Sequence, residues 1–62
     1  MCQSTVYLRE DNQEQLLLED VGFVQPEEGK ILLVNIFGEQ KLVEGEVKEI
    51  DLIHHKIVLE KR

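Results

Sequence analysis

The side chain best suited to chemistry in this sequence is that of Cys2, the only cysteine among its 62 residues. A single cysteine cannot form an internal disulfide. If Met1 is removed, however, Cys2 carries an α-amine and a thiol on one residue, and together they can close a chelate ring on a metal ion. Such amines and thiols have unperturbed pKa values of about 8 and about 8.5, so a metal can displace both protons near neutral pH.

Paired nitrogen and sulfur donors indicate which metal such a site would take. A square plane of nitrogen and sulfur is the arrangement that Ni(II) or Cu(II) favours. One chain supplies half of that plane, so two chains meeting at a symmetry axis would be needed to complete it. If Met1 is retained, the nitrogen would have to come from a deprotonated backbone amide. The simpler alternative is that Cys2 is an idle thiol near a chain terminus.

His54 and His55 are the other candidate metal ligands, and they lie in or beside the last predicted turn. Neighbouring residues on a strand point to opposite faces, so the two imidazoles would not easily bind one ion. Exposed turn histidines without a function are the alternative. The sequence contains no HxxxH, CxxC or HxE pattern, which removes the usual zinc signatures.

Catalytic patterns are absent from the sequence. The four glycines are isolated from one another, so there is no glycine-rich phosphate loop, and Ser4 is the only serine. The carboxylates of Glu44, Glu46 and Glu49 are expected to form a solvated strand edge that blocks aggregation. We therefore expect no enzymatic activity and no organic cofactor.

Composition narrows the class of protein. Thirteen acidic and seven basic residues give a net charge of -6, and the basic residues are scattered. Phosphate backbones need a basic stripe, which argues against nucleic acid as a partner.

We expect no signal peptide, and the longest apolar runs, LLL and ILLV, are too short to span a membrane. A free thiol without an export signal favours a reducing cytoplasm. The length predicts one domain, residues 1–62.

Turn-forming residues interrupt strand-forming stretches at regular intervals. Polar or glycine-containing turns are predicted at 10–13, 25–30, 37–40 and 52–55, with Asp11 and Asn12 at the tip of the first. The strands between them are predicted at residues 4–10, 14–24, 30–37, 40–52 and 55–61. Five strands in so short a chain cannot form two full sheets. The predicted fold is therefore all-β, a small five-stranded meander curled into a partly open barrel of the SH3-like or OB-like type.

One stretch, LVEGEVKEI at residues 42–50, fits two structures. Val43, Val47 and Ile50 have the spacing of a helix face. The alternation of Val43, Gly45 and Val47 also fits a strand, and an interior glycine costs a helix about 1 kcal/mol relative to alanine. We predict a strand, with a bulge or sharp bend at Gly45.

The third predicted strand is apolar on both faces. Its alternate residues form two apolar sets, with Ile31, Leu33 and Phe37 on one face and Leu32, Val34 and Ile36 on the other. A strand buried on both faces needs cover on both, and no helix is predicted. We hypothesise that a second copy of the chain covers the outer face, forming a homodimer. The alternative is that barrel curvature and long charged side chains cover it.

Several motifs along the chain are shared with a known family. They are the MC start, the STVYL strand, LEDV and the block NIFGEQKLVEGEVKEIDLIHHKIVLE. Together they resemble the CooT family of small proteins accessory to nickel insertion into carbon monoxide dehydrogenase, over about residues 1–60. Gln3 and His54 depart from the family pattern, and His54 could add affinity or selectivity for a metal.

The resemblance implies a fold, a metal and partners. Members are expected to be homodimers of small β-barrels that hold nickel at the dimer axis through the cysteine at position 2, here Cys2. We therefore expect a cytoplasmic Ni(II) chaperone that serves a client metalloenzyme or its maturation proteins. Many relatives carry an RNA-binding label, so an RNA-binding barrel is one alternative, although the negative charge and only three aromatic residues argue against it. A second alternative is a protein-docking adaptor in which Cys2 is idle.

Overall fold

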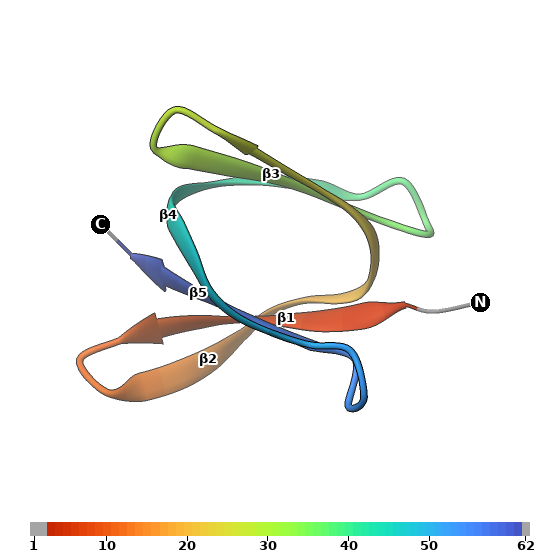
Figure 1. The fold of residues 1–62 in the computed structure, drawn as a ribbon. Coiled ribbons are helices and arrows are strands. Elements are labelled where there is room, and N and C mark those ends of the chain that lie inside the picture. The colour runs from red at the N-terminus through yellow and green to blue at the C-terminus, as the bar shows by residue number, and fades with distance from the viewer. Residues whose placement is uncertain (1–2, 62) are drawn as a thin grey trace.

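The chain folds into five strands joined by short turns (Figure 1). The computed structural model describes residues 3–61. The strands are β1 (Ser4–Glu10), β2 (Gln13–Glu27), β3 (Lys30–Asn35), β4 (Gln40–Asp51) and β5 (Lys56–Lys61). The described residues contain no helix, so the all-β prediction and the choice of a strand for residues 42–50 are confirmed.

The strands form a closed ring in which each pairs with its neighbours in the sequence. Four of the pairings are antiparallel, and the ring is closed by a parallel pairing of β1 with β5 that begins at Thr5 and Lys56. Register shifts interrupt the β1–β2, β2–β3 and β4–β5 pairs, so the ring is irregular. The predicted five-stranded meander curled into a small barrel is confirmed, and the parallel closure is what the structure adds to it.

Turn chemistry explains two of the strand ends. Asp11 and Asn12 have φ values of 54° and 63°, the left-handed conformation that both central residues of a type I′ hairpin turn adopt. The predicted turn at 25–30 is shorter than expected, because β2 continues through Pro26 to Glu27. Beyond Val21, β2 pairs only with β3, so Pro26 lies on a strand with one unpaired edge, where proline is tolerated.

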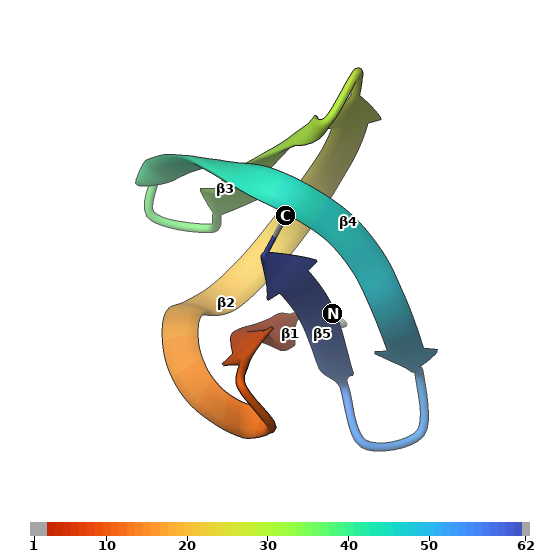
Figure 2. The same ribbon diagram turned by 90° about the vertical axis from the view of Figure 1, so that its left-hand side faces the viewer.

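Gly45 marks the point where β4 changes partner. Glu44 pairs with Lys30 of β3, whereas Gly45 pairs with Lys61 of β5. A Cβ atom on Gly45 would overlap the carbonyl oxygen of Glu60, so only glycine fits there. Figure 2 shows β4 arching over the ring. The register shift of β4 lies slightly further on, between Val47 and Glu49.

The core lies inside the ring and draws on four of the strands. Its buried members are Val6, Val21, Ile31, Leu33, Ile57 and Leu59. Val58 is also fully buried, although it points to the opposite face of β5 from its neighbours. Its cross-strand neighbour Tyr7 has the Lys56 ammonium 5.3 Å from its ring centroid, so long side chains cover this outer face. This covering lies on β5; for the outer face of β3, the choice between a second copy and covering by long side chains stays a prediction.

The outer face of β3 is less exposed than its sequence suggests. Leu32 and Val34 point outward but are half-buried, while the inward position after Leu33 is taken by Asn35. Asn35 ends the strand because its Oδ1 accepts hydrogen bonds from the Phe37 amide (3.0 Å) and the Glu39 amide (2.8 Å). The predicted strand at 30–37 is therefore two residues too long, and Phe37 lies in an exposed turn, apart from the core.

Candidate metal site

The start of β1 lies against the turn that joins β4 to β5. The Thr5 amide donates a hydrogen bond of 2.8 Å to the carbonyl oxygen of His55. The parallel register then continues with Thr5 beside Lys56. In Figure 1 the beginning of β1 and the β4–β5 turn are accordingly on the same side of the ring. Cys2, the predicted metal ligand, lies outside the described residues, three positions before Thr5.

Asp51 shapes the β4–β5 turn, residues 52–55. Its Oδ1 accepts hydrogen bonds from the amides of Ile53 and His54, both 3.1 Å long. Aspartate commonly folds a turn in this way, by accepting bonds from backbone amides two and three residues ahead. A hydrogen bond from the His54 side chain, followed by one from its backbone, lowers the pKa of the Asp51 carboxyl below its usual value. Asp51 is therefore held ionised in the turn.

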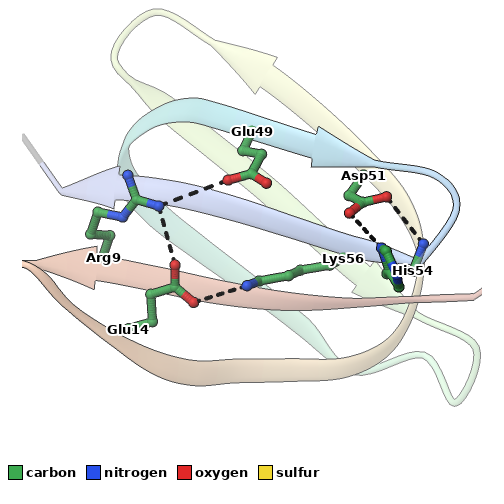
Figure 3. Close-up of polar contacts among 6 residues, drawn as sticks. All are labelled: Arg9, Glu14, Glu49, Asp51, His54 and Lys56. Atoms are coloured by element: carbon green, nitrogen blue, oxygen red, sulfur yellow. Dashed lines mark hydrogen bonds and ion pairs between the residues drawn. The ribbon is translucent and has the colours of Figure 1, made fainter.

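His54 is tethered by one ring nitrogen and open at the other. Its Nδ1 lies 2.8 Å from Asp51 Oδ2 (Figure 3), and an ionised carboxylate can only accept, so Nδ1 carries the proton. In the neutral imidazole, a proton on Nδ1 leaves a lone pair on Nε2. The side chain is 75% exposed. A carboxylate that orients an imidazole through one nitrogen is the usual support of a histidine metal ligand.

His55 has a different role in the same turn. It adopts a positive φ of 53°, which turns the chain into β5, and its carbonyl oxygen receives the Thr5 amide. Both predicted histidines are thus exposed turn residues and not members of a strand. Within residues 3–61, no group of three or more His, Cys, Asp or Glu side chains could hold a metal ion. Asp51 and His54 therefore form at most part of a site.

Two turns at this end of the ring carry exposed apolar side chains. We call Ile36, Phe37, Leu52 and Ile53 the apolar rim; the last three are between 70% and 84% exposed. Leu52 and Ile53 directly precede His54. Ile36 reaches the same end because its amide donates to the carbonyl oxygen of Asp20, close to the pairing of Ser4 with Val21. Each of the two turns therefore presents exposed apolar side chains to solvent.

A network of charged side chains joins β1, β2, β4 and β5 on the outside of the ring and serves the fold. Arg9 contacts Glu14 (3.1 Å) and Glu49 (3.8 Å), and Lys56 contacts Glu14 (3.1 Å), as Figure 3 shows. Hydrogen bonds from Arg9 and then Lys56 lower the pKa of the Glu14 carboxyl. This network covers the outer face of the buried strand β5, and its carboxylates are all solvated. We find no pair of carboxylates there with the distinct environments that acid–base catalysis uses.

Sequence reasoning missed Asp51. Its signal is the spacing D-L-I-H, in which an aspartate precedes a histidine by three residues across a turn. The contact was not predicted because residues 40–52 were taken as one continuous strand, with Asp51 inside the strand and His54 in the turn that follows it.

Among the residues that the structure describes, no helix is long and apolar enough to cross a membrane.

A family model and a solved structure each match nearly the whole chain. The family model described as CO dehydrogenase accessory protein CooT matches residues 1–60. The chain is 34% identical to a crystal structure named as CooT from Carboxydothermus hydrogenoformans, with a TM-score of 0.91 and 98% of each chain covered.

Two uncharacterised archaeal proteins are also similar to the chain. That of Methanocaldococcus jannaschii is 35% identical over 97% of this chain and 98% of its own. That of Archaeoglobus fulgidus is 42% identical over 69% of this chain and 96% of its own. With the family model spanning nearly the whole sequence and the fold shared, this chain belongs to the CooT family of CO dehydrogenase accessory proteins.

Proposed function

We propose that this chain is a cytoplasmic Ni(II)-binding protein that serves the maturation of a carbon monoxide dehydrogenase-type metalloenzyme, and that it binds one ion between two copies through Cys2. Its family supports the maturation role. The observation that carries the site is the hydrogen bond from Thr5 to His55, which anchors the start of β1 beside the turn that presents His54. In this proposal Cys2, three positions before Thr5, binds its ion near that turn, which is compatible with the span of at most about 11 Å that three residues of chain allow.

The donor set follows from the residues at this end. Cys2 supplies a thiolate and, if Met1 is removed, an amine. His54 is the better of the two histidines as a further donor, because Asp51 holds its Nδ1 and leaves Nε2 available. The turn is exposed, which suits a protein that must release its ion to a client. Nickel itself is the cargo, so a moderately stable and accessible site is what the role requires.

Two copies are needed because one chain offers too few donors. The apolar rim supports this arrangement, since its side chains are exposed on the two turns beside the start of β1 and would be buried if two such ends met. The contact would be apolar at its centre, as the cores of homodimer interfaces are. This places the expected interface at the two turns 36–39 and 52–55, whereas the sequence had suggested the outer face of β3.

The experiment is a nickel titration followed by absorption. Binding through sulfur should give a thiolate-to-nickel charge-transfer band that saturates at about half an equivalent of Ni(II) per chain. The variant Cys2→Ser should abolish the band. A matched control, Cys2→Ser combined with Ser4→Cys, keeps one thiol near the terminus but removes it from position 2, and should not restore the band. A band that survives Cys2→Ser would overturn the assignment of the ligand.

A protein-docking adaptor with an idle Cys2 is the second candidate, because the apolar rim alone would suit docking onto a maturation complex. The two candidates differ in their response to Cys2→Ser. An adaptor would still co-purify with its client after that change, and it would lose the client when Leu52 and Ile53 are replaced by serine.

A further inference from the structure

The end of the ring opposite the candidate metal site holds a cavity of about 550 Å³. Lysines from three strands line its opening: Lys30 at the start of β3, Lys41 in β4 and Lys61 at the end of β5. Figure 2 looks onto this end, where β5 terminates beneath the arch of β4. A cavity of this size at the mouth of a barrel falls in the range of small-molecule sites.

The cavity has an apolar floor. Leu8, Leu17 and Val43 line it, and all three are partly buried residues that pack against the core from its open side. They come from three different strands, so the floor is fixed by the ring itself and not by a loop. The apolar part of a ligand bound here would remove the surface of these side chains from water. Burying apolar surface is favourable by about 25 cal/mol per Å².

The charge around the opening is positive in a protein that is otherwise acidic. Three of the seven basic residues line this one cavity, although the net charge of the chain is -6. Glu44 is the one acidic residue in the lining. Lys61 approaches Glu10 at 3.6 Å, while no ion pair joins Lys30 or Lys41 to another described residue. Because the Debye length is about 8 Å at physiological salt, a ligand here would respond to these lysines more than to distant acidic residues.

We propose that this cavity binds a small amphipathic carboxylate, with its apolar body on Leu8, Leu17 and Val43 and its carboxylate among Lys30, Lys41 and Lys61. An inorganic anion would contact the lysines but leave the apolar lining in water. A neutral apolar molecule would cover the apolar lining but give Lys30 and Lys41 no ion-pair partner. A nucleic acid needs a longer basic track than three lysines provide. The proposal is independent of nickel binding, because the two sites are at opposite ends of the ring.

The test uses decanoate as the probe and the backbone amide signals of the full chain as the readout. Decanoate should shift the signals of residues that line the cavity, while 1-decanol, which has the tail without the charge, and acetate, which has the charge without the tail, should bind much more weakly. Replacing one lysine, Lys30→Gln or Lys41→Gln, should weaken decanoate binding by up to about fivefold, the size of a solvated ion pair. Raising the salt concentration should weaken it further.

Two controls separate this site from other causes. Lys48→Gln removes a lysine that pairs with Glu60 at 3.4 Å and does not line the cavity, and it should leave decanoate binding unchanged. Cys2→Ser should also bind decanoate normally, whatever it does to nickel. The proposal is overturned if decanoate does not bind at millimolar concentration, if 1-decanol binds equally well, or if the shifted signals belong to the apolar rim.

Discussion

Replacing Gly45 by alanine should destabilise this protein severely. Gly45 is the residue at which β4 leaves β3 and joins β5, and a Cβ there would overlap the carbonyl oxygen of Glu60. The obstacle is backbone, so it cannot be relieved by a side-chain rotation. The β4 and β5 backbones would have to separate at the point where the arch of β4 closes the ring.

The size of the effect follows from two contributions. Forcing extra volume into a closely packed site costs about 1–3 kcal/mol. The amide of Gly45 also donates to the carbonyl oxygen of Gly29 at 3.0 Å, and losing that bond costs about 1 kcal/mol more. The free energy of unfolding should therefore fall by about 2–4 kcal/mol. A chain of this length has only about 3–9 kcal/mol in total.

The assay is urea and thermal unfolding followed by far-ultraviolet circular dichroism. Gly45→Ala should lower the thermal midpoint by at least about 8 °C, since each kcal/mol moves a domain of this size by about 4–8 °C. Gly22→Ala is the matched control, because a Cβ there would meet only Ile36 Cγ2 at 3.8 Å, an ordinary contact. If Gly45→Ala unfolds within about 0.5 kcal/mol of the parent, a margin typical of neutral surface changes, the account of the arch is wrong.

Three further outcomes are expected. Asn35→Ala should lower the free energy of unfolding by about 2 kcal/mol, because it leaves the turn amides of Phe37 and Glu39 without their acceptor; a loss below about 0.5 kcal/mol in urea unfolding would contradict this. The lowered pKa of Asp51 means that its stabilising contribution is present above the usual value of 3.8 and is lost as the pH falls through the lower value in the folded state. Asp51→Asn should therefore flatten the acid limb of a plot of thermal midpoint against pH, and an unchanged limb would argue against the pairing. Finally, His54→Ala should weaken nickel binding by about tenfold while His55→Ala has little effect, and equal effects in calorimetric titrations would remove His54 as the additional donor.

Local chemistry made much of the fold predictable. The alternation of Thr5, Val6, Tyr7 and Leu8 ends at the Asp11–Asn12 pair, so β1 was predicted with its observed bounds. Glycine at position 45 drew attention to the point where β4 changes partner, although the register shift lies further on, between Val47 and Glu49. These signals are carried by neighbouring residues, and they need no knowledge of the rest of the chain.

The errors arise where distant strands decide the outcome. The parallel closure of β1 on β5 joins the two ends of the chain, and no local pattern encodes it. Pro26 was placed in a loop because the sequence does not show that β2 has one free edge at that position. Asn35 ends β3 early because it satisfies a turn from inside the ring, although its apolar neighbours favour a longer strand.

The same distinction applies to the candidate sites. Cys2 was suggested by its residue type, its place after Met1 and the family resemblance, and His54 by its residue type and its predicted turn. The hydrogen bond that brings the start of β1 to the β4–β5 turn could not be predicted, because it depends on the closure of the ring. Asp51 could have been found from its spacing to His54. The lysine-lined cavity could not, because Lys30, Lys41 and Lys61 are brought together only when three strands curl around one opening.

Native mass spectrometry of the protein, with and without Ni(II), tests the central claim most directly. The account predicts a species of two chains with one nickel ion, which is lost in Cys2→Ser and retained when Lys41 is replaced by glutamine. A single chain carrying its own nickel ion, or a two-chain species that keeps its nickel without Cys2, would contradict it.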